Sequence, residues 1–418
     1  MVPIDWKQGI IDDIATVSSG GTPSRANDSY WTDGFIPWVT TAEVKFGTIT
    51  DTEQKITEEG LKNSSAKLFP KDTILMAMYG QGKTRGQVAK LGIEASTNQA
   101  CAALQLCEGF DVDYYYQYLM SQYENIRELA NSGGQQNLSG GIVKGINIPI
   151  PPLLEQQKIA KILSTWDKAI STTERLIENS TQQKKALMQQ LLTGKRRLLD
   201  ESGKRFEGEW EEKTLIDAGM TVTDGDRGKE YPNSSEFYDK GDYLFLSAKN
   251  VTKKGFLFEE TQFISKEKYE KLGKGIINRG DVVLTTRGTV GQTAYYDDSV
   301  EYDFLRVNSG MVTLGCNNSE LESNFFYALT NSSLFTRQVD SLTFGSAQPQ
   351  LTIKIIKSLK VPIPSIPEQQ KIAIVLTNAD KEIELLEQQL ADLKQEKKAL
   401  MQVLLTGKKR VVVDGALV

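Results

Sequence analysis

The sequence predicts an α+β protein in which two α/β domains are joined by two long antiparallel helices that form a coiled coil, with a pseudo-two-fold internal repeat. Three observations lead to this prediction. One segment occurs twice, each copy has an apolar stripe at helical spacing, and the remaining stretches hold short β-type runs separated by Gly, Asn and Asp. A chain of 418 residues is also long enough for more than one core.

The repeat is the clearest feature of the chain. Residues 148–197 and 361–410 align without a gap at an offset of 213, and 27 of the 50 positions are identical. Both copies contain EQQKIA near the start and KKALMQ followed by LLTGK near the end. We therefore expect four segments, namely a first domain (1–147), a central helical spacer (148–197), a second domain (198–360) and a C-terminal helical spacer with a tail (361–418).

Each copy of the repeat is expected to form one long helix. Prolines stand at the start of both predicted helices, Ser365 with Glu368 has the spacing of a capping box, and Gly194 and Gly407 stand where the helices should end. A helix from Glu155 to Thr193 would be about 58 Å long at 1.5 Å per residue. A helix of this length needs a partner, because an isolated one would expose its apolar stripe.

The apolar stripes have alternating spacings of four and three residues, which predicts a coiled coil. Because the order along the chain is domain, helix, domain, helix, paired helices must run antiparallel. The alternative is that each stripe packs only on its own domain. The predicted seam consists of Ile159, Leu163, Trp166, Ile170, Thr173, Ile177, Ser180, Lys184, Leu187 and Leu191, matched by Ile372, Leu376, Ala379, Ile383, Leu386, Leu390, Leu393, Lys397, Leu400 and Leu404.

The two domains also resemble each other, although less closely than the helices do. The run beginning at Phe35 resembles the one at Tyr243, and the run beginning at Asp72 resembles the one at Asp281. Both domains are expected to contain a small sheet, with helical stretches near Tyr114–Leu129 and Glu322–Val339. A shared framework with different loops would suit two readers of different sequences.

Composition excludes several kinds of chemistry. The chain has no histidine, which removes histidine-based triads and histidine-ligated metals. Its three cysteines lack CxxC spacing and are expected to be small core residues, without disulfides or zinc. No apolar run is long enough for a membrane helix and the start does not resemble a signal peptide, so we expect a cytoplasmic protein with no membrane association. We expect no catalytic residues, metal ligands or cofactors.

The net charge of −5 is unusual for a nucleic-acid binder, since affinity for nucleic acid comes largely from neutralising phosphates. Basic residues nevertheless cluster locally, at Lys83–Arg85, Lys195–Arg197, Lys354–Lys360 and Lys408–Arg410. Such a distribution suits a protein that shares its DNA contacts with partner subunits.

The order of domain, EQQKI helix ending in LLTGKRR, domain, EQQKI helix ending in LLTGKKR resembles the specificity (S) subunit of Type I restriction-modification systems, over essentially the whole chain. SGGTPSR at Ser19–Arg25 and IPWVTT at Ile36–Thr41 also resemble target-recognition domains of that family. The resemblance implies that each domain binds half of a bipartite double-stranded DNA target. It also implies that the helices bind two methyltransferase (M) subunits, to which nuclease/translocase (R) subunits attach. The second domain departs from the pattern, because Thr223-Asp-Gly-Asp-Arg-Gly replaces GGTPSR.

Ala77–Thr84 comes close to a phosphate-binding P-loop, but its first glycine is missing and no helix is evident after Thr84. We instead interpret it as a glycine-containing loop that places basic side chains near phosphates or guanine. Side chains of Arg, Lys, Asn, Gln, Ser and Thr read bases, so loops rich in them are candidates. The DNA-binding candidates are Ser24, Arg25, Thr40, Thr41, Lys83, Arg85, Gln135, Gln136 and Asn137 in the first domain, and Arg227, Lys249, Asn250, Arg287, Gln348 and Gln350 in the second.

Three other functions remain open from the sequence. The chain could be a coiled-coil scaffold that does not bind DNA, a recognition subunit of another restriction class, or a P-loop nucleotide hydrolase. Any single candidate residue could equally be ordinary polar surface.

Overall fold

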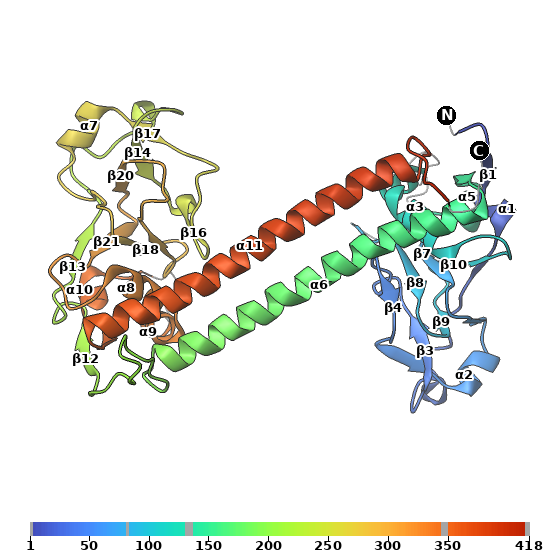
Figure 1. The fold of residues 1–418 in the computed structure, drawn as a ribbon, viewed down its shortest axis with the longest axis horizontal. Coiled ribbons are helices and arrows are strands. Elements are labelled where there is room, and N and C mark those ends of the chain that lie inside the picture. The colour runs from blue at the N-terminus through green and yellow to red at the C-terminus, as the bar shows by residue number, and fades with distance from the viewer. Residues whose placement is uncertain (1–2, 81–82, 130–136, 344–349, 414–418) are drawn as a thin grey trace. The chain divides into compact units, whose positions relative to one another are not determined.

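The computed structural model describes residues 3–80, 83–129, 137–343 and 350–413 (Figure 1). The chain divides into two compact units, each of which contains parts of both long helices. Unit 1 comprises Met1–Arg175 and Gln388–Val418, and unit 2 comprises Leu176–Glu387. Each unit has its own hydrophobic core.

Unit 1 is built on two sheets. A five-stranded sheet has the order β2-β10-β7-β8-β4 and a four-stranded sheet has the order β5-β3-β9-β6, while β1 and β11 form a separate antiparallel pair. The central strand β7 reads ILMA and is buried along its whole length. The strands are β1 (Lys7–Ile10), β2 (Ala15–Ser19), β3 (Ile36–Val39), β4 (Thr48–Ile49), β5 (Gln54–Ile56), β6 (Leu68–Phe69), β7 (Ile74–Ala77), β8 (Val88–Leu91), β9 (Ala95–Thr97), β10 (Cys101–Leu106) and β11 (Asn147–Ile150).

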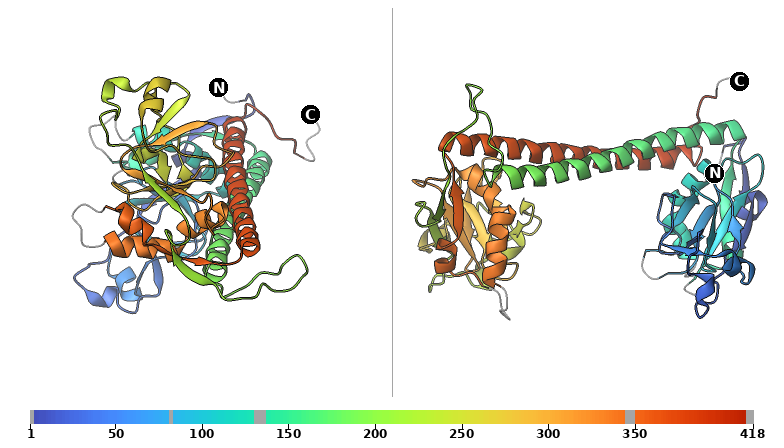
Figure 2. Two further views of the ribbon diagram at one scale, coloured as in Figure 1. Left: turned by 90° about the vertical axis from the view of Figure 1, so that its left-hand side faces the viewer. Right: turned by 90° about the horizontal axis from the view of Figure 1, so that it is seen from below.

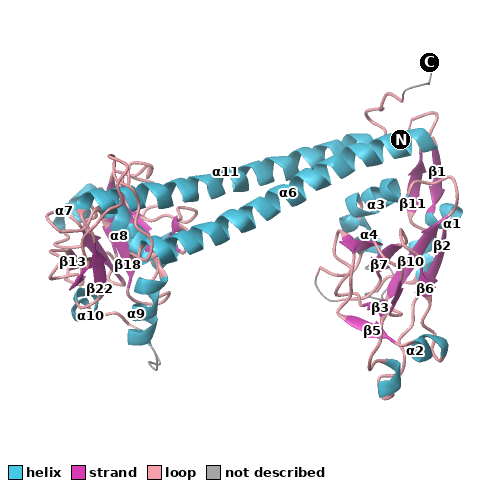
Figure 3. Cartoon of the chain, turned by 60° about the horizontal axis from the view of Figure 1, so that its bottom comes forward, coloured by secondary structure: helices cyan, strands magenta, loops and turns pink. Residues whose placement is uncertain are grey.

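Helices cover one side of the five-stranded sheet of unit 1, as the secondary-structure colouring of Figure 3 shows. The core there joins Ile74, Met76 and Leu104 of the sheet to Tyr115 of α3 and Ile159 of α6. The helical elements are α1 (Ile11–Ile14), η1 (Asp28–Tyr30), α2 (Glu58–Lys62), α3 (Val112–Ser121), α4 (Tyr123–Leu129), α5 (Gly140–Lys144) and the start of α6 (Leu153–Leu191).

Unit 2 repeats this plan with smaller sheets, in the orders β13-β21-β18-β19 and β17-β14-β20, plus the pairs β12-β22 and β15-β16. Its strands are β12 (Glu211–Thr214), β13 (Thr221–Asp224), β14 (Tyr243–Leu246), β15 (Val251–Thr252), β16 (Gly255–Phe256), β17 (Phe263–Ile264), β18 (Val282–Thr285), β19 (Thr293–Tyr295), β20 (Phe304–Val307), β21 (Met311–Gly315) and β22 (Lys360–Ile363). Its helical elements are η2 (Ser234–Glu236), η3 (Ala248–Asn250), α7 (Lys266–Lys271), α8 (Ser323–Thr330), α9 (Ser333–Thr343), α10 (Ile353–Lys357) and the start of α11 (Ile366–Leu404).

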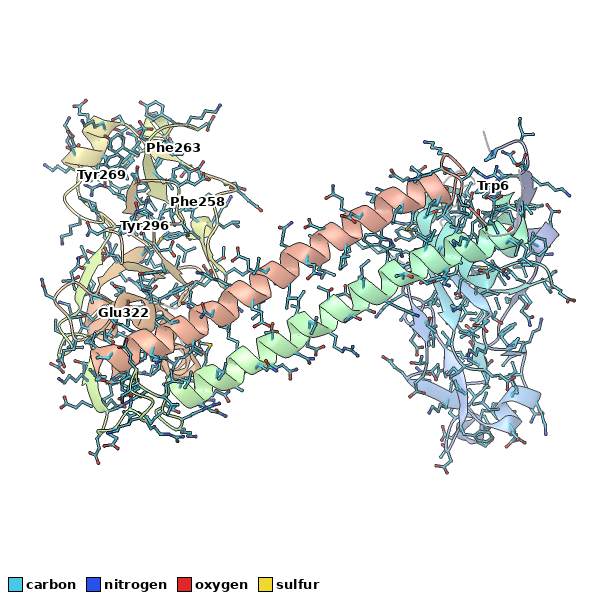
Figure 4. All side chains as sticks on the ribbon, viewed as in Figure 1. Trp6, Phe258, Phe263, Tyr269, Tyr296 and Glu322 are labelled. Carbon is cyan, nitrogen blue, oxygen red and sulfur yellow. The ribbon has the colours of Figure 1, made fainter. Side chains whose placement is uncertain are left out.

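The helical stretches predicted in the two domains are confirmed as α3 with α4 and as α8 with α9. An aromatic cluster fills the part of unit 2 around β14, β17 and α7, and Figure 4 labels Phe258, Phe263 and Tyr269 within it. Phe258 and Phe263 both contact the ring of Tyr302, with centroids 5.0 and 5.8 Å apart. Tyr296 donates a hydrogen bond to the backbone oxygen of Tyr302.

Within each unit a segment of α6 lies beside a segment of α11, and the two run antiparallel (Figures 1 and 2). In unit 1, Lys397 forms a 2.6 Å ion pair with Asp167, and Lys394 forms one with Glu174. Residue numbers thus rise along α6 as they fall along α11. In unit 2, Lys184 pairs with Asp380. That pair is the repeat equivalent of Asp167 with Lys397, because both positions shift by 213.

Every seam residue named above is buried or half-buried, as a seam requires. The helices span residues 153–191 and 366–404, within two residues of the predicted start and end of the first. Seam residues near the starts of the two helices also pack on the domains. Ile159 and Leu163 belong to the core of unit 1, and Ile372 and Leu376 to that of unit 2. The two interpretations of the apolar stripe therefore hold at different points along the same helices.

Two minor expectations were wrong. Glu368 does not act as the carboxylate of a capping box, because its oxygens accept hydrogen bonds from Arg197 and Trp210. Cys107 is exposed, whereas Cys101 and Cys316 are buried as expected. In the described part of the chain, no helix combines the length and apolar character that crossing a membrane requires.

Candidate nucleic-acid interface

In unit 1 the loops that carry most of the predicted DNA-binding residues meet at one edge of the sheets. The backbone N–H of Gly21, after β2, donates to Thr97 at the end of β9 over 2.8 Å. Met78, after β7, donates to Ala100 over 2.8 Å and accepts from Leu138 over 3.0 Å. We call residues 20–25, 40–43, 78–80, 83–85, 98–100 and 137–138 the loop edge of unit 1.

The two backbone contacts of Met78 recur in unit 2. Thr286, after β18, donates to Gly310 over 2.8 Å and accepts from the N–H of Leu351 over 3.1 Å. Thr286 is thus the counterpart of Met78, and Leu351 that of Leu138. The loop edge of unit 2 comprises residues 225–228, 247–250, 286–291, 308–310 and 350–351.

A glycine allows the first loop to pass close to its neighbour in both units. A Cβ atom on Gly20 would lie 1.9 Å from the backbone oxygen of Thr97, and one on Gly225 would lie 2.1 Å from that of Asn308. Real Cβ atoms do not approach backbone oxygens so closely, so only glycine fits either position. The second domain therefore keeps the glycine of the first loop although the rest of the motif differs.

An asparagine turn follows the parallel strand in both units. Asn98 accepts a hydrogen bond from the N–H of Ala100 at 3.1 Å, and Asn308 accepts one from Gly310 at 2.8 Å. This turn places Gln99 at the loop edge of unit 1, where its exposed amide oxygen accepts from the hydroxyl of Thr22. Sequence reasoning missed both Gln99 and Thr22. The strand-plus-Asn pattern, which recurs as Val307-Asn308, was the available signal.

Arg25 is held by a glutamine and two aromatic rings. Its guanidinium lies 3.6 Å from the ring centroid of Trp31 and 5.0 Å from that of Trp38, and its Nη2 donates to Gln54 at 2.6 Å. Ser24 is exposed beside it, and its backbone oxygen accepts from the Trp31 indole.

The other unit 1 candidates differ in their exposure. Thr40 already donates its hydroxyl to Glu43, whereas Thr41 is half-buried with no such bond among the described residues. Lys83 and Asn137 are exposed, and Arg85 is half-buried. Gln135 and Gln136 lie outside the described residues.

In unit 2, Arg227, Lys249, Arg287 and Gln350 are exposed at the loop edge. Arg227 donates to the backbone oxygen of Ser309 at 3.2 Å and lies 3.6 Å from Asp224, and Lys249 pairs with Glu260 at 2.5 Å. Gln348 lies outside the described residues.

The prediction that Asn250 contacts DNA was wrong. Its side chain is 2% exposed. Its amide oxygen accepts from the N–H and hydroxyl of Ser247, and its amide nitrogen donates to the backbone oxygens of Leu257 and Glu260. Asn250 thus holds the loop after β14 in place, just as Glu43 does for Thr40 in unit 1.

The P-loop hypothesis fails on local structure. A P-loop joins a strand to a helix whose N-terminus faces the phosphates. Here β7 instead leads into β8, which pairs with it antiparallel, Leu75 opposite Ala89. The chain reaches Val88 of β8 soon after Thr84 without an intervening helix, so Lys83 lies in a turn between two strands of one sheet.

The pKa values of Cys101 in unit 1 and Asp226 in unit 2 are shifted by their surroundings. Burial raises the pKa of the Cys101 thiol to about 12, which leaves it protonated and unreactive at neutral pH. At the loop edge of unit 2, hydrogen bonds from backbone N–H groups, that of Gly228 above all, lower the pKa of Asp226. Its carboxylate also accepts from the N–H of Gly273 at 2.7 Å, so it ties the first loop to the loop after α7.

Comparison with known proteins identifies relatives along the whole chain. The family described as Type I restriction modification DNA specificity domain matches twice, at residues 3–180 and 207–395. The chain is 28% identical to the Type I restriction enzyme MjaVIII specificity subunit of Methanocaldococcus jannaschii, over 98% of this chain and 94% of that protein. The MjaIX specificity subunit of the same organism is 26% identical, over 98% and 95%. Among solved structures, the Type-I restriction-modification system S subunit from M. genitalium has the same fold, with a TM-score of 0.61, 20% identity and 96% coverage of both chains.

Proposed function

The chain belongs to the Type I restriction modification DNA specificity domain family, and we propose on that basis that each of its units reads one half of a bipartite double-stranded DNA target. It is a specificity subunit, and its role is recognition. The observation that carries the proposal is the recurrence of one loop edge in both units, with the same glycine, the same asparagine turn and the same backbone contacts at Met78 and Thr286. The side chains on the two edges differ, as two readers of unlike half-sites require.

The proposed DNA contacts are the exposed and half-buried candidates of the loop edges, together with the two residues that the structure adds. They are Thr22, Ser24, Arg25, Thr41, Lys83, Arg85, Gln99 and Asn137 in unit 1, and Arg227, Lys249, Arg287 and Gln350 in unit 2. Thr40 is added to this set. Thr40 and Thr22 serve only as hydrogen-bond acceptors, because the hydroxyl proton of Thr40 is already donated to Glu43 and that of Thr22 to Gln99.

Adenine methylation and DNA cleavage are assigned to partner subunits. Two methyltransferase subunits bind the helices, one in each unit, and nuclease/translocase subunits join through that complex. Apolar side chains exposed near the starts of the helices support this arrangement. Leu153 and Leu154 of α6 are 39% and 60% exposed, and Ile366 and Ile374 of α11 are 43% and 60% exposed. Leu153 and Ile366 are equivalent in the repeat.

Domain exchange tests the DNA-reading role. Residues 1–147 are replaced by the corresponding domain of another specificity subunit, and adenine methylation by the complex is mapped across a bacterial chromosome. The expected result is a change in one half of the methylated site. A change in both halves, or in neither, would reject modular reading. A scaffold that does not touch DNA would show no salt-dependent binding to duplex DNA, whereas a reader loses affinity steadily as salt rises.

Partner stoichiometry is tested separately by native mass spectrometry of the complex. Leu154→Lys and Ile374→Lys are each expected to remove one methyltransferase subunit, and the double variant both. Leu199→Lys, at a 51% exposed leucine outside the helices, is the matched control. A complex that keeps both subunits in the double variant would place the docking surface elsewhere.

A further inference from the structure

Each unit presents one exposed arginine that a glutamine oxygen holds in place. In unit 1 this is Arg25, whose Nη2 donates to the amide oxygen of Gln54 at 2.6 Å. In unit 2 it is Arg287. The amide oxygen of Gln350, turned toward Arg287, accepts from its Nε at 3.2 Å and its Nη2 at 3.0 Å. From these two arrangements we propose that Arg25 and Arg287 each read a guanine, so that each half-site contains an essential G·C pair. The inference rests on the proposed DNA-reading function.

The neighbours of Arg25 fix both its plane and its loop. Its guanidinium stacks on Trp31, which meets Trp38 edge to face with centroids 5.1 Å apart. The indole N–H of Trp31 donates to Ser24 at 3.1 Å, and that of Trp38 donates to Gly21 at 3.0 Å. The two tryptophans therefore hold the loop that carries Arg25 and provide the surface on which its guanidinium lies.

The backbone contacts of the preceding residue position Arg287. It follows Thr286, whose N–H donates to Gly310 and whose oxygen accepts from Leu351, the residue after Gln350. Because the Gln350 oxygen occupies the edge formed by Nε and Nη2, the two Nη1 protons and the second Nη2 proton remain for a ligand.

The chemistry of the holding group points to a base and not a phosphate. A glutamine oxygen orients a guanidinium without neutralising it, and within the described residues no carboxylate lies within ion-pair distance of Arg25 or Arg287. By contrast, Arg227 and Lys249 on the same edge of unit 2 each have a carboxylate nearby. Guanine offers O6 and N7 side by side in the major groove, and a pre-oriented arginine fork matches them. A phosphate contact does not need a fixed plane, since a lysine serves as well.

The two arginines occupy different positions in the common framework. Arg25 stands two residues before Asn27, which caps η1, and Tyr231 stands two residues before Asn233, which caps η2. Tyr231 packs against Phe245 and thus fills the place of Arg25 in unit 2. Conversely, Arg287 follows Thr286 as Tyr79 follows Met78. The guanine should therefore fall at different places in the two half-sites.

The test uses the full chain with its cognate methyltransferase subunit in a bacterial host that lacks its own adenine methylation. Chromosomal DNA is the probe, and methylation is read at single-molecule resolution at every variant of the target. Arg25→Lys is expected to lower the preference for guanine about ten-fold at one position of one half-site. Arg287→Lys should do the same in the other half-site. Each variant is the matched control for the other, and thermal melting checks that both fold.

Gln54→Leu keeps the arginine but removes its hydrogen-bond partner. It is expected to weaken the preference at the same position as Arg25→Lys, by a smaller factor and with methylation retained, which identifies Gln54 as a positioning residue. If Arg25→Lys abolishes methylation, binding of the complex to duplexes with each of the four bases at that position gives the same comparison.

Three results would overturn the inference and leave the proposed function intact. They are a wild-type half-site without an invariant G·C pair, unchanged preference in the arginine variants, and a uniform loss of methylation across all target variants, as expected for phosphate contacts. A wild-type complex that methylates without any two-part sequence preference would instead reject the proposed function.

Discussion

Arg197 donates to both carboxylate oxygens of Glu368, at 2.6 and 2.7 Å, and so joins the end of one repeat to the start of the other. The same pair recurs in unit 1 as Arg410 with Glu155. In each unit the arginine also lies over a tryptophan, Trp210 in unit 2 and Trp6 in unit 1. Figure 4 labels Trp6. The EQQ and GKRR motifs are therefore explained by their contact with each other, which closes each unit.

The glutamine next to this glutamate extends the contact into the domain. Gln156 accepts from the N–H of Asp111, the residue that caps α3, and Gln369 accepts from that of Glu322, which caps α8. Figure 4 labels Glu322. Both glutamines also donate to the backbone oxygen five residues before them. The start of each long helix is thus tied to one domain helix.

Glu368→Gln should destabilise unit 2. The carboxylate of Glu368 is 1% exposed, and its loss leaves Arg197, 19% exposed, without its counter-charge. We expect a loss of about 2 kcal/mol, because removing one partner of a buried ion pair leaves the other poorly solvated. Urea denaturation with peptide-resolved hydrogen exchange would assign the loss to unit 2. Glu212→Gln, which breaks the exposed pair with Lys360, is the control and should change stability by less than about 0.5 kcal/mol. Equally small losses of stability in the two variants would show that the ion pair between Arg197 and Glu368 does not stabilise unit 2.

The two substitutions that break the seam ion pair between Lys397 and Asp167 should change the stability of unit 1 by different amounts. Lys397 is 8% exposed whereas Asp167 is 43% exposed and also accepts from Gln117. Asp167→Ala should cost unit 1 about 2 kcal/mol, since it strands a buried ammonium group. Lys397→Met should be neutral or stabilising by about 1 kcal/mol, because the aspartate it leaves can be hydrated and methionine suits a seam. Denaturation midpoints at an unchanged m-value would measure both. The reverse order would contradict this account of the pair.

Gly20→Ala should disrupt the loop edge of unit 1. The new Cβ would fall 1.9 Å from the backbone oxygen of Thr97, so the first loop must move away from β9. We expect a loss of about 2 kcal/mol, as for other overpacked sites, and loss of discrimination in one half-site only. Gly140→Ala is the control, because nothing lies within 4 Å of its Cβ and it begins α5. That substitution should be neutral or slightly stabilising. The methylated site is mapped for both variants. Full discrimination in Gly20→Ala as well as in Gly140→Ala would show that the close approach of Gly20 to Thr97 is not needed for recognition.

The long helices could be predicted from sequence in detail because their stabilising contacts are periodic. Spacings of four and three residues place Ile159 and Leu163 on one stripe, and the buried side of the helix follows directly. Antiparallel pairing followed from chain order alone. The partner of Glu368 could not be predicted in this way, because Arg197 is 171 residues distant in sequence and no local pattern links them.

The loop residues were harder to predict, because polar side chains serve both structure and recognition. Asn250 and Arg287 are both polar residues in a loop after a buried strand, so their sequence contexts are similar. Asn250 is nevertheless buried and caps a turn, whereas Arg287 is exposed. Gln54 and Gln350 acquire their roles only through the arginines that they contact. Whether a polar residue faces solvent depends on tertiary neighbours that a single sequence does not reveal.

Stability of unit 2 should depend on Asp226 at acid pH. Backbone hydrogen bonds, first that from Gly228, lower the pKa of this carboxyl in the folded chain below its ordinary value of 3.8. The folded state therefore favours the ionised form, so its contribution is complete above the unfolded pKa and is lost as pH falls through the folded one. At pH 7 the free energy of unfolding of the wild type should exceed that of Asp226→Asn by about 1 kcal/mol, which is the usual contribution of such a hydrogen bond. The difference should shrink below about pH 4.

Urea denaturation of both proteins between pH 7 and pH 2 measures this difference. Glu209→Gln is the control, because Glu209 is exposed and makes no hydrogen bond or ion pair among the residues that the structure describes. Its stability should follow that of wild type at every pH. A wild-type advantage over Asp226→Asn that stayed constant down to pH 2 would mean that the aspartate stabilises the loop through its shape and not through its charge.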